Sequence, residues 1–290
     1  MPELFQSVVN GVLLGGLYAS IAIGLSIVFG VMRLVNLAHG DLLILAGYAG
    51  LLLATCFGIS PLAGLVVIVP LLFIAGFGLQ KHLFNRTMRQ GPEPPLLTAL
   101  GLSIVIQNTL LVLFTPDARF LSTDLSVQTV RITDSVVVSA VYLLGFLSGL
   151  GIIILLHAFL RGTALGIAIR ASSDDEQTAR LMGIDTYETY AYAAGIAAAT
   201  AGVAGIVMGM TFTFYPSSGP QYLIIAFGVV VIGGMGSMLG TLTGGILLGL
   251  AQLVGGNLLG PGYQLLCGYA VLFAVLIMRP QGIFGGKVHD

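Results

Sequence analysis

Charged side chains are scarce in this chain and gather in one short stretch. The 290 residues include 11 basic and 12 acidic side chains, and residues 170–185, RASSDDEQTARLMGID, contain six of them. A serine with a glutamate three residues later has the spacing of a capping box, acidic residues suit the first turn of a helix, and a basic residue and a glycine suit its end. The pattern predicts a short, strongly specified helix whose ends are formed by Ser173, Asp174, Asp175, Glu176, Arg180 and Gly183.

The predicted helix has a small apolar face, formed by Ala179 and Met182 at a spacing of three residues. An isolated helix of about nine residues is marginal in water, so we expect it to dock on another surface. The preceding stretch, Thr163–Ala171, is compatible with a second short helix. In the alternative interpretation, the charged helix lies on the membrane surface.

A second group of ionisable side chains lies between two apolar stretches, in residues 33–50, RLVNLAHGDLLILAGYAG. His39 and Asp41 at membrane depth would indicate a functional site. The alternative is that Asn36 or His39 ends one helix and Asp41 begins the next at the cytoplasmic interface, and both interpretations stay open. Catalysis is disfavoured, because His-Glu-x-x-His and Gly-x-Ser-x-Gly motifs are absent and no second intramembrane carboxylate pairs with Asp41. We predict no metal site.

Three polar residues interrupt the apolar stretch LTALGLSIVIQNTLLVLF, residues 97–114. Ser103 and Gln107 are four apart and share a helix face, and Asn108 follows. They could line a polar path or bond across helices, and bonding is the favoured interpretation. No Gly-x4-Gly-Lys-Ser/Thr phosphate-binding motif occurs anywhere in the sequence. We therefore expect that this chain binds no cofactor and does not hydrolyse ATP by itself.

The amino-acid composition indicates the class of fold that positions these residues. The chain is 57% hydrophobic with a mean hydropathy of +1.02, too apolar for a soluble domain of this length. A helix crosses the hydrocarbon core with about 20 residues. An all-α polytopic membrane protein is predicted, since a membrane barrel shows short alternating segments instead. The clearest spans are Leu4–Met32, Leu62–Leu79, Leu96–Thr115, Val136–Phe159 and Tyr190–Phe214.

Repeated glycines indicate how these spans pack. Gly236, Gly240 and Gly244 follow one another at intervals of four, a spacing that lets helix backbones approach closely. We therefore predict one compact, Gly-rich bundle over residues 1–290, in a single transmembrane domain. The net charge of −1 gives no support for a nucleic-acid partner.

Lys and Arg set the predicted orientation. They cluster around residues 81–89, in the loop 161–187, and after the last span at Arg279 and Lys287, and basic loops stay in the cytoplasm. Parity then places the N-terminus, the loop Pro116–Asp134 and the segment Tyr215–Gln221 in the periplasm. We predict a bacterial inner-membrane protein with a cytoplasmic C-terminus.

The number of spans near the C-terminus remains open. The residues between Gln221 and Arg279 fit one span with a re-entrant hairpin or three short spans, so we predict about eight or nine transmembrane or re-entrant helical segments. Within the loop 116–134, SVQTVRIT alternates like a strand.

Five stretches together resemble one known family: NGVLLGGLYASIAIGLSIVFGVMRLVNLAHGD, LGLSIVIQN, RASSDDEQTARLMGID, VVIGGMGSMLGTLTGGILLG and RPQGIFG. In this order, from Asn10 to Gly285, they resemble the LivH-type permease of branched-chain amino acid ABC importers. The strings Asn36–Asp41 and Leu181–Ile184 are the most specific in combination. A departure is Ile167, where the family often has a basic residue, so the contact with the ATPase is expected to be less electrostatic or displaced along the loop.

The resemblance implies a set of partners. Such a permease pairs with a homologous second permease of LivM type, is driven by two cytoplasmic ATPase subunits of LivG and LivF type that use ATP and Mg, and receives substrate from a periplasmic binding protein. The family's coupling helix falls within Thr163–Ile184. The resemblance thus implies a transport subunit in the lipid bilayer, not an enzyme, with a charged helix that transmits the movement of the ATPase.

The substrate class and two other transport mechanisms remain to be weighed. Related permeases import urea, short amides, other amino acids and small carboxylates, and a sparsely charged path fits urea almost as well as an aliphatic zwitterion. An ion-coupled secondary transporter would need ligands near the midplane, and Asp41 is the sole carboxylate in the membrane-proximal core. In a passive channel, the capped cytoplasmic helix would have no function.

Overall fold

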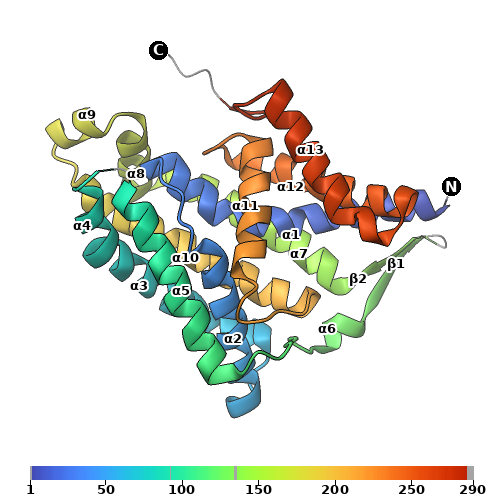
Figure 1. Ribbon diagram of the computed structural model, residues 1–290. Coiled ribbons are helices and arrows are strands. Elements are labelled where there is room, and N and C mark those ends of the chain that lie inside the picture. The colour runs from blue at the N-terminus through green and yellow to red at the C-terminus, as the bar shows by residue number, and fades with distance from the viewer. Residues whose placement is uncertain (1, 92, 134–135, 286–290) are drawn as a thin grey trace.

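The computed structural model describes residues 2–91, 93–133 and 136–285, and Figure 1 shows their arrangement. Within these residues, eight helices are long and apolar enough to cross a membrane, and a shorter apolar helix, α11 (Gly219–Gly233), accompanies them. This confirms the prediction of an all-α polytopic membrane protein with eight or nine segments. Lys287 lies outside the described residues.

Long helices make up most of the fold, and short elements lie between them. The long helices are α1 (Pro2–Met32), α2 (His39–Phe57), α3 (Pro61–Leu79), α5 (Glu93–Phe114), α7 (Ala140–Gly162), α10 (Thr186–Thr211), α12 (Met238–Leu259) and α13 (Gln264–Met278). The short elements are η1 (Gln80–Phe84), α4 (Asn85–Met88), α6 (Asp124–Val127), β1 (Thr129–Thr133), β2 (Val136–Ser139), α8 (Ala164–Asp174), α9 (Glu176–Leu181) and η2 (Pro261–Tyr263).

The helices α1 and α10 form the centre of the bundle. Their most apolar windows are 83% and 78% buried, against 6% for α13. The helices α1 and α12 touch backbone to backbone, because a Cβ added at Gly15 would overlap Ile246, and one added at Gly245 would overlap the Gly15 carbonyl. Glycine therefore permits this close contact, as small residues at a four-residue spacing predict.

Two helices begin in the middle of the bundle instead of at its ends. After α1 ends at Met32, the chain turns back, and α2 starts at His39, whose Nε2 lies 2.8 Å from the carbonyl oxygen of Ile21. Ile21 is about 16 Å from the Met32 end of α1, at 1.5 Å per helical residue. In the same way the chain folds back after α10, and α11 starts at Gly219, beside Gly40.

The two broken segments share a short sequence pattern. Residues 27–30 read IVFG at the end of α1, and residues 206–209 read IVMG at the end of α10. The distance along the chain from Gly30 to Gly40 equals that from Gly209 to Gly219. Gly30 contacts Gly236 at one end of the bundle, whereas Gly209 contacts Leu121 at the other. The helices α1 and α10 therefore run in opposite directions through the bundle.

The connections gather at two opposite ends of the molecule. In Figure 1 the elements α4, α8 and α9 lie at one end, and the hairpin of β1 and β2 lies at the other. The alternating stretch forms β1 only from Thr129 on, because Ser126 and Val127 belong to α6. The strand pairs antiparallel with β2, through Val130 opposite Val138. The predicted span Val136–Phe159 is therefore too long, because its first residues form β2 and α7 starts at Ala140.

The segment Tyr215–Gln221 lies partly inside the bundle. Tyr215 is 44% exposed, but Ser218 is 8% exposed, α11 begins within the segment at Gly219, and Gly219 contacts Asp41 in the interior. Its placement on the periplasmic side stays a prediction. The segment contains no charge, so it can enter the bundle, where its backbone is covered by protein.

Candidate functional site

The charged stretch forms two short helices instead of one. The helix α8 starts at Ala164 and continues to Asp174, and its N-cap is Thr163, whose Oγ1 accepts a hydrogen bond from Gly166 N at 3.0 Å. The second helix, α9, has Asp175 as its N-cap, with Oδ1 accepting from Gln177 N at 2.9 Å and from Thr178 N at 3.1 Å. The short helix predicted within Thr163–Ala171 is confirmed, and it is longer than expected.

The capping box predicted for Ser173 and Glu176 is wrong. Ser173 lies in the last turn of α8, and its hydroxyl donates to the carbonyl oxygen of Gly30 at 2.6 Å. Asp175 takes the N-cap position instead, because a carboxylate accepts two backbone N–H groups there. The Thr178 side chain and N–H also donate to this carboxylate, and they lower the pKa of Asp175 from its ordinary value. Asp174 is exposed beside it.

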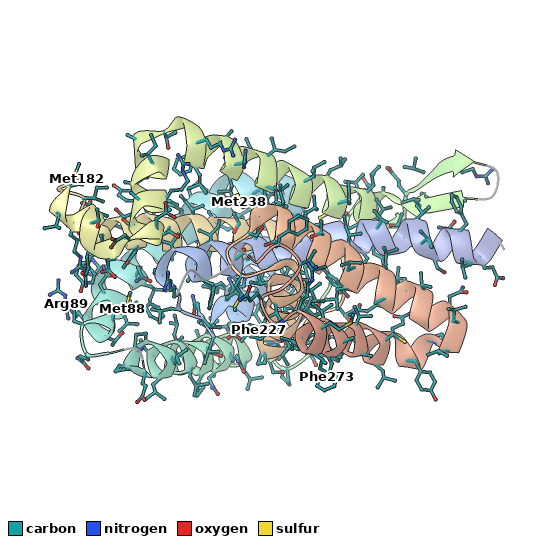
Figure 2. The ribbon with its side chains drawn as sticks, turned by 90° about the horizontal axis from the view of Figure 1, so that it is seen from above. Met88, Arg89, Met182, Phe227, Met238 and Phe273 are labelled. Atoms are coloured by element: carbon teal, nitrogen blue, oxygen red, sulfur yellow. The ribbon has the colours of Figure 1, made fainter. Side chains whose placement is uncertain are left out.

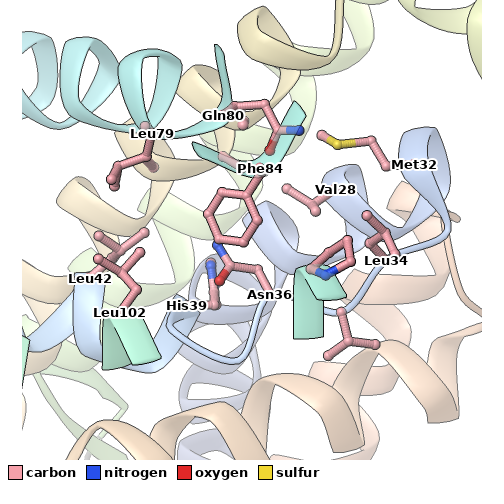
Figure 3. A pocket seen from close by; sticks show the side chains of 16 residues that line it. Val28, Met32, Leu34, Asn36, His39, Leu42, Leu79, Gln80, Phe84 and Leu102 are labelled. Carbon is pink, nitrogen blue, oxygen red and sulfur yellow. The ribbon is translucent and has the colours of Figure 1, made fainter. Parts of the chain in front are cut away.

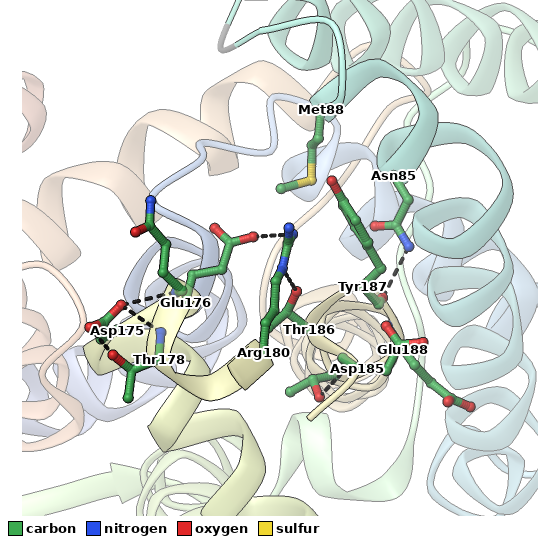
Figure 4. Close-up of polar contacts among 12 residues, drawn as sticks. Asn85, Met88, Asp175, Glu176, Thr178, Arg180, Asp185, Thr186, Tyr187 and Glu188 are labelled. Atoms are coloured by element: carbon green, nitrogen blue, oxygen red, sulfur yellow. Dashed lines mark hydrogen bonds and ion pairs between the residues drawn. The ribbon is translucent and has the colours of Figure 1, made fainter. Parts of the chain in front are cut away.

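Arg180 joins α9 to the start of α10. Its guanidinium pairs with Glu176 and donates through Nε to Thr186 Oγ1 at 2.8 Å. The same group lies over the Tyr187 ring, 4.8 Å from its centroid. Figure 4 shows these contacts converging on the first turn of α10. The pair with Glu176 is exposed on both sides and contributes little to stability by itself, so Arg180 acts chiefly by orienting α9.

The end of α9 presents apolar side chains. Gly183 has a φ of +85°, and Ile184 N donates to the Ala179 carbonyl at 3.1 Å, which together form a Schellman stop, as expected for Gly183. Ala179 is only 4% exposed, whereas Met182 is 79% and Leu181 86% exposed. The predicted face of Ala179 and Met182 is therefore wrong: Ala179 packs inside the protein, and the exposed tip consists of Leu181 and Met182. Figure 2 shows Met182 at the opposite end from the β-hairpin.

A second candidate site lies where the two half-helices meet. His39 is 2% exposed and Asp41 is fully buried, so both lie inside the bundle, not at an interface. The Asp41 carboxyl contacts Gly219 at the start of α11 and faces the side chains of Ser103 and Gln107. Its oxygens form no hydrogen bond of standard geometry among the described residues. A negative charge at this position is stabilised by the N-terminal ends of two helix dipoles, those of α2 and α11.

The polar residues of α5 divide into two groups. Gln107 Nε2 donates to Ser103 Oγ at 3.0 Å within α5, and both face Asp41 of α2. Besides this bond within α5, both side chains meet Asp41 on a neighbouring helix, which is the kind of contact that the favoured interpretation expects. Asn108 is exposed and donates to the carbonyl oxygen of Ile104 at 2.8 Å in its own helix. Ser103 and Gln107 therefore belong to the central site, and Asn108 does not.

A cavity, here called the central cavity, adjoins this junction. It lies among α1, α2, α3, α5 and α10, and it has an apolar lining with three polar residues, Asn36, His39 and Gln80. Figure 3 shows Asn36, His39 and Phe84 close together in it. Asn36 Oδ1 accepts from Ala38 N at 3.0 Å, which fixes the turn before α2. An apolar pocket with a few convergent polar groups is typical of small-molecule sites, but this cavity measures only about 30 Å³, roughly the volume of one water molecule, so it is closed to a substrate in this state.

A chain of polar contacts joins the central cavity to the charged helices. Gln80 Nε2 donates to Asn85 Oδ1 at 3.0 Å, and Asn85 Nδ2 donates to the carbonyl oxygen of Tyr187 at 3.0 Å. The guanidinium of Arg180 in turn lies over the ring of Tyr187. Sequence reasoning missed Gln80 and Asn85, although both are amides in the otherwise basic connection QKHLFNRTMRQ.

Eight apolar helices of spanning length, two half-helices that meet inside the bundle and an ordered charged loop at one end define a polytopic membrane transport protein. The family model described as branched-chain amino acid transport system / permease component matches residues 7–278, and the chain belongs to that family.

Named relatives cover nearly the whole chain. It is 31% identical to the high-affinity branched-chain amino acid transport system permease protein BraD of Pseudomonas aeruginosa, over 98% of each chain. It is 28% identical to the LivH protein of the same description from Escherichia coli, over 97% of this chain and 95% of that one. A probable LivH of Methanocaldococcus jannaschii is 25% identical over 95% of this chain and 91% of that one. No solved structure matches the chain.

Proposed function

We propose that this chain forms one of the two membrane subunits of an ATP-driven importer of branched-chain or related amino acids. A homologous LivM-type permease pairs with it, two ATPase subunits of LivG and LivF type supply the energy with ATP and Mg, and a periplasmic binding protein delivers the substrate. The observation that carries the proposal is the polar chain from Arg180 through Tyr187 and Asn85 to Gln80. This chain of contacts connects the exposed apolar tip of Leu181 and Met182 to the central cavity. A movement of an ATPase docked at the tip can therefore be transmitted to the substrate path.

Reconstitution tests this function. The chain is placed in vesicles with the second permease, the ATPases and the binding protein encoded beside it, and uptake of leucine and of urea is measured with and without internal ATP. ATP-dependent leucine uptake supports the proposal. Urea is the second candidate, because the few charges along the path fit it too, and uptake of urea alone would overturn the amino-acid assignment.

The orientation is part of the proposal. The end with α8 and α9 faces the cytoplasm, and the β-hairpin end faces the periplasm, because the basic residues gather at the former. We expect cysteines introduced at Ser126 and Gln177, after replacement of Cys56 and Cys267, to react with an impermeant maleimide from opposite sides of the inner membrane. Labelling of both from the periplasm contradicts the assignment.

The central cavity is proposed as part of the substrate path. Leu102 lines it, whereas Leu100, on the same helix, is 47% exposed and faces away. Leu102→Trp fills the cavity and should lower uptake at least about tenfold, since one overpacked side chain in a packed site costs ~1–3 kcal/mol. Leu100→Trp is the matched control and should transport normally. Equal uptake by both variants, with the assembled complex intact, contradicts this path.

Asp41 separates the ATP-driven mechanism from ion coupling. In the proposed mechanism its carboxylate holds the ends of α2 and α11 together and moves no proton. Asp41→Asn keeps the shape and an acceptor oxygen and loses about 1–2 kcal/mol of interaction with the helix dipoles, so substantial uptake should remain. Abolished uptake, together with collapse of wild-type uptake when the proton gradient is dissipated and ATP remains, would establish a secondary transporter.

A further inference from the structure

A second cavity, here called the basic cavity, opens at the same end of the molecule as α8. It lies between the ends of α1 and α7, the helix α8 and the residues that begin α12. Two arginines and a histidine line it, Arg161, Arg170 and His157, and none of its described lining residues is acidic. It is separate from the central cavity and has no part in the path proposed above.

The arginines are available to an anion. Among the described residues, neither guanidinium forms an ion pair with a carboxylate. Arg170 donates through Nε to the Leu160 carbonyl oxygen at 2.9 Å, which holds its side chain against the end of α7. Both arginines and His157 are exposed, so a ligand can reach them from outside the protein.

A helix N-terminus adds to the positive potential. The 22-residue helix α12 begins at Met238 with Ser237 as its N-cap, and Ser237 Oγ accepts from Gly240 N at 3.0 Å. Ser237, Met238 and Leu239 all line the basic cavity. The first turn of α12 therefore directs free N–H groups and the positive end of its dipole toward the same space as the arginines.

Part of the lining is apolar, and this part indicates which kind of anion binds. Met235, Leu239 and Phe284 line the basic cavity, and each is more than 40% exposed. The cavity sits where the spanning helices α1 and α7 end, which is the level of lipid headgroups. A free phosphate would use only the basic side, whereas a phospholipid would use both the basic and the apolar parts.

We propose that the basic cavity binds an anionic phospholipid, with Arg161, Arg170 and the N-terminus of α12 around its phosphate and Leu239 and Phe284 along its acyl chain. Basic pockets between spanning helices at the cytoplasmic surface suit such headgroups. Because Arg170 and Ser173 belong to α8, the bound lipid fixes α8 against the bundle and so holds the adjoining helix α9 in place.

The test uses the full-length chain in neutral detergent, with thermal unfolding followed as phosphatidylglycerol, phosphatidylcholine or inorganic phosphate is added. Phosphatidylglycerol should raise the unfolding temperature saturably, and the other two should not. Arg161→Gln, which removes no hydrogen bond seen in the structure, should weaken the apparent affinity for phosphatidylglycerol about fivefold, and Arg161→Gln with Arg170→Gln about 25-fold, from the contribution of one basic residue near an anionic lipid. Native mass spectrometry should count one retained phosphatidylglycerol fewer in the double variant.

A matched pair of charges serves as the control. Lys81→Gln with Arg86→Gln removes two positive charges at the same end but outside the basic cavity, and it should keep the wild-type response. An equal loss in this control shows unspecific attraction and overturns the proposal, as does an unchanged response of Arg161→Gln. Stabilisation by phosphate alone assigns the site to a free anion. Weakened ATPase association in Arg161→Gln with an unchanged lipid response assigns it to the ATPase, and either result overturns the lipid.

Discussion

Met182→Glu is expected to abolish ATP-driven uptake while the chain still inserts and folds. Met182 is 79% exposed at the tip beside α9, so within this chain the glutamate stays in water at little cost. In the proposed complex the same charge is buried in the ATPase groove, where an unpaired charge costs about 3–5 kcal/mol. Association with the ATPase should therefore weaken at least ~100-fold, as measured by co-purification, and uptake should stop.

Two variants on the same short helix locate the docking face. Gln177→Glu adds the same charge to α9, but away from the tip of Leu181 and Met182. Gln177 lines a separate cavity, of which neither tip residue is part, so the change should leave ATPase association and uptake near normal. Ala179→Glu should also stop uptake, but by disturbing the loop itself, because Ala179 is buried, and its unfolding temperature should fall. Normal ATPase binding by Met182→Glu would show that the tip of Leu181 and Met182 is not the docking face.

Gly40→Ala is expected to have the largest effect on folding. A Cβ at Gly40 would overlap the carbonyl oxygen of Gly219, so the half-helices α2 and α11 could not meet as they do. A backbone atom cannot move aside as a flexible side chain can, and overpacking of a tight site costs ~1–3 kcal/mol or more. We expect a lowered unfolding temperature in detergent, a reduced amount of protein in the membrane and loss of uptake.

Gly101→Ala is the control for this substitution. Gly101 is also helical, on α5, and an added Cβ there meets no atom within 4 Å, so the change should be neutral. Gly219→Ala should reproduce the Gly40→Ala defect, because its Cβ would overlap the Asp41 carboxyl. If Gly40→Ala folds and transports like Gly101→Ala, the junction of α2 and α11 is not as close as described.

The sequence by itself determined the class of protein and most of its helices. Apolar stretches of spanning length follow from the hydrophobic cost of leaving them in water, and that requirement is local and additive along the chain. For the same reason the strand Thr129–Thr133, the second helix around Thr163–Ala171 and the stop at Gly183 could be predicted. Each depends on a few neighbouring residues and on no distant contact.

Only the tertiary structure decided where the functional side chains lie. The sequence left His39 and Asp41 open between an interface and the interior, because a turn of six residues can lie outside the membrane or fold back into the bundle. Gly219, which contacts both Gly40 and Asp41, is far along the chain, so local sequence could not show this contact.

The cap of α9 was decided in the same way. Ser173 and Asp175 are both good N-cap residues, and local pattern favoured Ser173. Its hydroxyl instead donates to Gly30 at the end of α1, a contact that no local pattern contains. Ala179 is buried in α9, which packs against the neighbouring helices α8 and α10, whereas Leu181 and Met182 are exposed. The positions of these side chains depend on contacts with backbone that is distant in the sequence. Long-range packing, and not residue spacing, therefore determined both candidate sites.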